Sequence, residues 1–139
     1  MNILVDTSVW SLSLRRKPGD LSAAQRRTVS ELTELIQEGR ARIIGPVRQE
    51  LLSGIKSPAQ YEELRRALQS FRDEPIQTTD YETAAKASND CRLKGVIVSS
   101  VDVLICAVAF ARRWSIFTTD PDFENYATIL PIMIHSPRS

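Results

Sequence analysis

Short apolar runs alternate with amphipathic segments along the chain, and this alternation constrains the fold more than any other feature. Residues 2–5 form an apolar run, and the segment from Ser22 to Gly39 repeats apolar residues at helical spacing. A strand followed by a helix and a further strand is the unit of a parallel sheet. The sequence therefore predicts an α/β fold, namely a three-layer α/β/α sandwich around a mostly parallel sheet of four to five strands.

The same patterns locate the individual elements. Ser22 with Gln25, and Thr79 with Glu82, form capping boxes that mark helix starts. Strands are expected at residues 2–5, 42–44, 75–76, 115–118 and 132–134. Helices are expected at residues 9–14, 23–38, 46–53, 58–71, 80–94 and 100–113, and residues 121–126 form a loop or a short helix.

Length and composition indicate one ordinary globular domain over residues 1–139. The chain has 139 residues, and its 18 Lys and Arg against 17 Asp and Glu give a net charge of +1. The longest apolar run, residues 103–111, is half the ~18 residues that a membrane span needs. No basic leader precedes the first apolar run. We therefore expect a cytoplasmic protein that does not enter a membrane, with both cysteines reduced.

Several chemistries are excluded by residues that the chain lacks. It has a single histidine, His135, so neither a His/Cys zinc site nor a conventional Ser-His-Asp site is expected. Its five glycines never occur as G-x-G, which excludes a dinucleotide-binding fingerprint.

Four acids occupy positions that predict a shared site. Asp6 directly follows the first strand, and Asp120 follows the strand expected at 115–118. Glu50 lies in the helix after the second strand, and Asp102 lies in the first turn of the helix that begins near Ser100. Because ligands bind at the carboxyl edge of a parallel sheet, we expect these carboxylates to converge there.

Such a cluster requires a compensating charge. Two carboxylates about 5 Å apart repel by roughly 3 kcal/mol at an effective dielectric constant of 20. A ligand set made of oxygen atoms alone suits a hard cation, so Mg²⁺ is the expected cofactor and Mn²⁺ a substitute. Hard cations held by carboxylates serve phosphoryl chemistry.

Each acid also has an ordinary explanation when it is taken alone. Asp6 can be a turn residue whose carboxylate bonds to backbone amides, and Glu50 can be a solvated helix residue. Asp102 can be the acid of a capping box with Ser99. Asp120 and Asp122 fit turn residues. The prediction of a site therefore depends on the joint placement of the acids.

Four segments that carry these acids resemble, in order, the successive motifs of PIN-domain ribonucleases, and most closely the VapC-type toxins of toxin–antitoxin pairs. These segments are Val5-Asp6-Thr7-Ser8-Val9-Trp10, Glu50-Leu51-Leu52-Ser53-Gly54, Asp102-Val103-Leu104-Ile105 and Thr118-Thr119-Asp120-Pro121-Asp122-Phe123. The likeness covers nearly the whole chain, whereas residues 61–76 show no motif.

The resemblance implies a PIN-like fold and a Mg²⁺-dependent endoribonuclease. It assigns catalysis to five residues, namely Asp6, Glu50, Asp102, Asp120 and Thr118. It assigns metal binding to four carboxylates, namely Asp6, Asp102, Asp120 and Asp122. It also implies a cognate antitoxin that covers the acidic cleft with a cationic side chain, and a homodimer.

The remaining charge suits an RNA substrate. When the four catalytic acids and Asp122 are set aside, twelve acidic residues remain against 18 basic residues. Candidate substrate contacts are Ser8, Arg15, Arg16, Lys17 and Arg112, with Arg113 beside the last.

Three alternatives remain open at this point. An aspartyl phosphatase usually has a D-x-D motif, and Asp6-Thr7-Ser8 does not match it. A PIN-like module that has lost catalysis would lack an acid. A nuclease that acts on DNA or in RNA processing would use the same residues.

Overall fold

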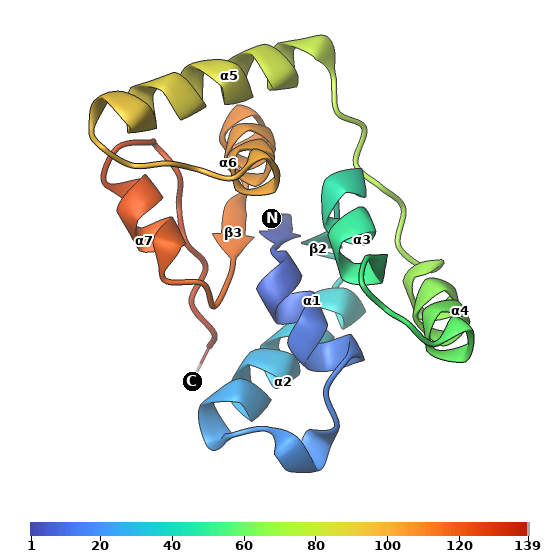
Figure 1. Cartoon of the computed structure of the whole chain (residues 1–139). Coiled ribbons are helices and arrows are strands. Elements are labelled where there is room, and N and C mark those ends of the chain that lie inside the picture. Colours follow the sequence, from blue (N-terminus) through green and yellow to red (C-terminus); the bar gives the residue numbers. More distant parts are fainter. Residues whose placement is uncertain (139) are drawn as a thin grey trace.

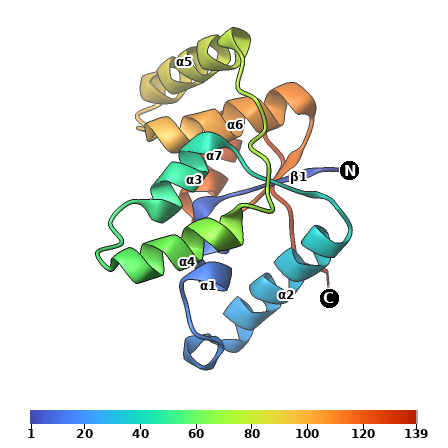
Figure 2. The ribbon, with the colours of Figure 1, turned by 90° about the vertical axis from the view of Figure 1, so that its right-hand side faces the viewer.

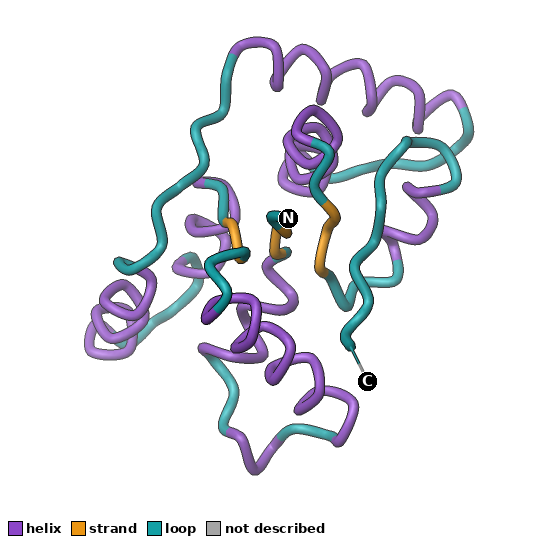
Figure 3. Tube along the Cα trace, turned by 180° about the vertical axis from the view of Figure 1, so that it is seen from behind, coloured by secondary structure: helices purple, strands orange, loops and turns teal. Residues whose placement is uncertain are grey.

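Three parallel strands form the centre of the computed structural model, which describes residues 1–138. They are β1 (Ile3–Val5), β2 (Ala41–Arg42) and β3 (Ser115–Phe117), in the order β2-β1-β3. In the register, Ile3 stands opposite both Ala41 and Ser115. Figure 3 shows the strands side by side with helices above and below them.

Neither outer strand that the sequence predicts is formed: 132–134 is reduced to a single bridge, and 75–76 is unpaired, with the only bridge beside β2 two residues earlier in the described chain. Ile43 pairs with Asp73, and Ile116 pairs with Ile134, both in parallel. Pro75 has no N–H group, so the ladder beside β2 cannot continue through it. The sheet therefore has three strands instead of four or five, although five parallel segments lie side by side.

Helices cover both faces of the sheet and confirm the three-layer arrangement. One layer is formed by α5 and α6, and the opposite layer by α1 and α2, with α3 and α4 beside β2 and α7 after β3 (Figures 1 and 2). The bounds are α1 (Thr7–Leu14), α2 (Ala23–Gln37), α3 (Gly45–Leu52), α4 (Pro58–Leu68), α5 (Thr78–Leu93), α6 (Ser100–Arg112) and α7 (Asp122–Ala127), and a short 3₁₀ helix covers Pro18–Asp20.

The core lies between the sheet and these helices. All three residues of β1 are almost fully buried, which is expected for a central parallel strand. The buried indole of Trp10 donates its N–H to the carbonyl of Val5 at 3.2 Å and meets the ring of Phe71 edge-on at 4.9 Å. Within residues 1–138, no helix has the length and apolarity that crossing a membrane requires.

One predicted capping box is confirmed and the other is wrong. Ser22 and Gln25 cap α2 reciprocally. Helix α5, however, begins at Thr78, and Asp80 accepts the N–H of Gln77 at 2.9 Å. Asp80 is drawn inward because Arg112 donates to both of its oxygens, at 3.1 and 3.0 Å. These contacts also hold the pKa of Asp80 below its usual range.

A buried carboxylate fastens the C-terminal segment to α2. Glu31 is 3% exposed and contacts His135 Nε2 at 2.6 Å and Arg138 Nε at 2.8 Å. Burial opposes the ionisation of Glu31, but the hydrogen bonds from His135 and Arg138 outweigh it and lower its pKa. Because the pKa is lower in the folded state, this contribution to stability is present above pH 4.5 and is lost as the pH falls through the folded-state value.

Replacing this carboxylate tests the contribution. We expect Glu31→Gln to lower the free energy of unfolding at pH 7 by about 2 kcal/mol, because charge-assisted hydrogen bonds to a buried group are lost. Urea unfolding at pH 7 and at pH 3.5 measures the effect, which should shrink at the lower pH. The matched control is Glu34→Gln, since Glu34 also pairs with Arg138 but is exposed. Equal losses in the two variants would contradict a special role for Glu31.

Candidate active site at the carboxyl ends of the strands

The parallel sheet brings the four predicted acids to one edge. Asp6 follows β1 and caps α1, and Asp120 lies three residues after β3 ends. Helix α6 precedes β3 and runs back along the sheet, so Asp102 in its first turn lies at the same edge. Glu50 is exposed on α3, which follows β2.

The Asp6 carboxylate is held by one of its two oxygens. Its Oδ2 accepts hydrogen bonds from the Ser8 N–H at 3.3 Å, from Ser8 Oγ at 2.7 Å and from Thr118 Oγ1 at 2.8 Å. In the described part of the chain, Oδ1 receives no hydrogen bond and is not among the fully enclosed polar atoms. Asp6 is therefore fixed in position while one oxygen stays available to a ligand.

Two hydroxyl groups join the loop after β3 to the start of α1. Ser8 Oγ accepts the N–H of Thr119 at 3.0 Å, and Thr118 Oγ1 accepts the N–H of Asp120 at 3.0 Å. Asp120 Oδ1 in turn accepts the N–H of Asp122 at 2.9 Å. The structure therefore places Ser8 and Thr118 beside Asp6 and fixes the backbone that carries Asp120.

Asp102 occupies a different environment from Asp6. Its N–H donates to Ser99 Oγ at 3.1 Å, so Ser99 caps α6 as the sequence predicts. Its carboxylate, however, accepts the phenol hydroxyl of Tyr126 at 3.0 Å. This contact directs the carboxylate towards α7, and burial beside Asp102 also raises the pKa of Tyr126.

The pKa of Asp102 reflects both its burial and the charges of the other three acids. Its pKa is raised to about 6, first by burial and then by the charges of Asp6, Asp120 and Glu50. The hydrogen bond from Tyr126 acts in the opposite direction. Because the pKa is higher in the folded state, ionisation of Asp102 destabilises the metal-free fold as the pH rises through about 6.

The donor set fits a hard divalent cation, although its ligands are not assembled. Within residues 1–138, no three Asp, Glu, His or Cys side chains are close enough together to hold a metal ion. The available donors at this edge are carboxylate oxygens, one of them the free Oδ1 of Asp6, and these suit Mg²⁺ or Mn²⁺. Their mutual repulsion is what a bound cation would relieve.

The remaining predicted residues lie in three places. Asp122 is exposed in the first turn of α7, close enough for its charge to raise the pKa of Tyr126. Arg15, Arg16 and Lys17 are exposed just beyond the end of α1. Arg112 does not join the acids, because it lies ten residues after Asp102, about 15 Å along α6.

Arg112 is occupied elsewhere. Its guanidinium pairs with Glu74 at 2.8 Å and with Asp80 at 3.0 Å, and it also donates to the carbonyl of Pro75 at 3.0 Å. These bonds join α6 to α5 and to the segment before it. A contact with substrate phosphate is therefore no longer expected of this side chain, whereas the neighbouring Arg113 is exposed.

Sequence analysis missed two polar groups at this edge. Tyr126 lies on the same face of α7 as Phe123, a spacing that indicates core packing, and its ring does meet Phe123 edge-on at 5.2 Å. Its hydroxyl contact with Asp102 has no sequence signal. Thr7 follows Asp6 directly, and its Oγ1 is buried without a hydrogen-bond partner in the described chain.

The repulsion within the cluster can be measured without metal or substrate. In EDTA, the Asp102 carboxyl carbon should titrate near pH 6 by NMR, and Glu50→Gln should lower that midpoint because one repelling charge is removed. Glu82→Gln, on the exposed face of α5, is the control and should leave it unchanged. A wild-type midpoint near pH 4, or no response to Glu50→Gln, would mean that the acids do not interact.

Comparison with known proteins gives a family match and several structural matches. A family model described as PIN domain matches residues 3–129. FitAcB from Neisseria gonorrhoeae is 23% identical, with 97% of each chain covered and a TM-score of 0.75. VapBC2 from Rickettsia felis, bound to a DNA fragment from the promoter, is 16% identical, with 97% of this chain and 98% of that chain covered and a TM-score of 0.71.

A toxin–antitoxin complex from Klebsiella pneumoniae is 18% identical, with 99% of each chain covered and a TM-score of 0.67. No curated protein sequence matches the chain. At these identities, the structural matches establish a common fold over nearly the full length.

Proposed function

Since the chain belongs to the PIN-domain family, we propose that it is a Mg²⁺-dependent endoribonuclease that acts as the toxin of a toxin–antitoxin pair. The observation that carries this proposal is the placement of Asp6, Glu50, Asp102 and Asp120 at one edge of the sheet. There, burial first and then the charges of the other three acids raise the pKa of Asp102. A fold that keeps four carboxylates within mutual range at a sheet edge suits a divalent cation and a phosphodiester substrate.

In this proposal Asp6, Asp102, Asp120 and Asp122 hold Mg²⁺, or Mn²⁺ in its place, and Glu50 completes the catalytic acids. A divalent cation in such a site activates water and offsets negative charge on phosphoryl oxygens. The protein supplies the orientation of its ligands.

Neighbouring hydroxyl groups provide that orientation. Ser8 and Thr118 fix Asp6 through Oδ2 and leave Oδ1 for the cation. Tyr126 sets the direction of the Asp102 carboxylate. Such groups act by positioning other residues that bind the ligand.

We further propose that a cognate antitoxin covers the acids and places a cationic side chain among them. The similarity to a toxin–antitoxin complex supports this partner. The unbalanced carboxylates favour an arginine, because a guanidinium can bridge two oxygens.

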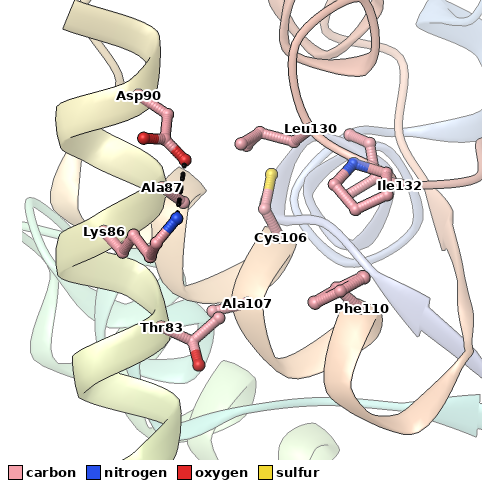
Figure 4. Close-up of a pocket in the computed structure, with 10 residues that line it drawn as sticks. Thr83, Lys86, Ala87, Asp90, Cys106, Ala107, Phe110, Leu130 and Ile132 are labelled. Carbon is pink, nitrogen blue, oxygen red and sulfur yellow. Dashed lines mark ion pairs between the residues drawn. The ribbon is translucent and has the colours of Figure 1, made fainter.

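A homodimer is proposed from an exposed apolar surface formed by α6 and by the segment that pairs with β3. Phe110 and Met133 are 46% and 49% exposed, and Phe110 also lines a hollow of about 240 Å³ between α5, α6 and the segment after α7. Figure 4 shows Cys106, Phe110, Leu130 and Ile132 around this hollow, with the ion pair between Lys86 and Asp90 on α5. A second copy of the chain would bury this surface.

Cleavage of single-stranded RNA in Mg²⁺, compared with EDTA, tests the proposed activity. Cleavage is expected only with the metal, and Asp120→Asn should reduce its rate about a hundredfold or more while retaining the acceptor for the Asp122 N–H. Asp20→Asn, an exposed position in the 3₁₀ helix, is the matched control and should cleave like wild type.

The result distinguishes the proposal from its alternatives. Cleavage in EDTA, or an active Asp120→Asn variant, would contradict the metal-dependent site. Cleavage of DNA in preference to RNA would replace the substrate, and hydrolysis of a small phosphate ester alone would indicate a phosphatase.

A further inference from the structure

A basic groove lies between the end of α1, the connection from α3 to α4, and α4 itself. It is a hollow of about 600 Å³, within the usual range for ligand sites. Its charged lining consists of Arg15, Arg16, Lys17 and Lys56 together with a single carboxylate, Glu63. Below these charges, Leu14, Ile55 and Leu64 form an apolar floor. Figure 2 shows α1 and α4, the two helices that border the groove.

The four cations of the groove form no ion pair in the described part of the chain, because all the ion pairs found there join other residues. All four residues are exposed. The positive charge of the groove is therefore not neutralised by the protein, and an anionic ligand is favoured there. Three of the cations come from the segment after α1 and the fourth from the facing connection, so a ligand that lies between them meets positive charge on two sides.

Two helices, α1 and α3, connect the acidic cluster to the groove. Helix α1 is capped by Asp6 and ends at Leu14, eight residues later and about 12 Å along its axis. Helix α3 carries Glu50 and ends two residues before Gly54, which lines the groove. Helices α1 and α3 are in contact. A polyanion that reaches the acids therefore passes into the basic groove within a few of its repeating units.

We propose that this groove binds the phosphodiester backbone of single-stranded RNA on one side of the cleavage point, with Arg16 and Lys56 contacting phosphates from opposite walls. The inference rests on the proposed function and adds to it a second binding region and a strand preference. The apolar residues that line the groove favour a single strand, whose unpaired bases can pack on them, over a duplex, whose bases are stacked inside the helix. Glu63 lies on α4, so phosphates are favoured near the α1 wall. Gln60 adds a polar group that does not repel them.

Binding in EDTA tests the groove separately from cleavage. The probe is a short fluorescein-labelled single-stranded RNA of mixed sequence, followed by anisotropy across a range of salt concentrations. The variant Arg16→Gln/Lys56→Gln removes two groove charges, and Arg92→Gln/Lys94→Gln removes two exposed charges at the far end of α5. Thermal melting first establishes that both variants fold.

We expect the groove variant to bind RNA about tenfold more weakly at 0.15 M salt and to reduce the slope of log K against log salt by about 1.4, since each single-strand phosphate contact contributes ~0.7. The control variant should bind like wild type. Double-stranded RNA of the same length should compete poorly.

Three results would overturn the inference. The first is wild-type affinity and salt slope in the groove variant, and the second is competition by duplex RNA as strong as that by the single strand. The third is binding of a labelled poly-glutamate peptide, and of no RNA, that depends on Arg16 and Lys56. The last result would identify a surface for an acidic protein segment. If the wild-type protein cleaves RNA and one of these three results is found, the groove inference fails and the proposed function is retained. If RNA binding depends on the groove but no RNA is cleaved, the proposed function is contradicted and the groove inference is retained.

Discussion

Both the fold and the candidate site depend on the hydrogen bonds that the Asp6 carboxylate accepts. Through Oδ2 it caps α1 and accepts the Thr118 hydroxyl, which joins the central strand, the first helix and the loop after β3. The backbone N–H of the same residue donates to the carbonyl of Phe117 at 2.8 Å. These bonds leave Oδ1 free, so the residue that organises the sheet edge also presents a charge to it.

Placing the other acids around Asp6 has an electrostatic cost that the structure does not fully relieve. Burial and three neighbouring carboxylates raise the pKa of Asp102, and the Tyr126 hydroxyl offsets only part of this effect. By contrast, the buried acids Glu31 and Asp80 are paired with basic side chains, and their pKa values are lowered. The protein therefore neutralises the carboxylates that serve its fold and leaves unneutralised those at the carboxyl edge of the sheet, which favours a cationic ligand there.

The sequence was sufficient to predict the three-layer fold and the placement of the acids, because both follow from periodicity and from the rule that parallel strands end at one edge. It was not sufficient where tertiary contacts decide. The start of α5 depends on Arg112, which is distant in sequence, and the same ion pairs remove Arg112 from the predicted substrate contacts. The hydroxyl of Tyr126 and the pairing of residues 73 and 134 with the sheet likewise depend on distant partners.

The two sequence-based interpretations of Asp6, a site acid and a structural turn acid, prove compatible because its two oxygens have different environments. Helix capping needs only an acceptor, which an amide oxygen also supplies, whereas cation binding needs the negative charge.

The most direct measurement of the central claim is therefore the melting temperature of Asp6→Asn in EDTA and in millimolar Mg²⁺, beside that of the wild type. The account predicts that the metal-free variant is as stable as wild type, or more stable by up to about 1 kcal/mol, because repulsion is relieved. It also predicts that Mg²⁺ raises the melting temperature of the wild type but not that of the variant. A variant that loses about 1 kcal/mol in EDTA and is still stabilised by Mg²⁺ as the wild type is would contradict it.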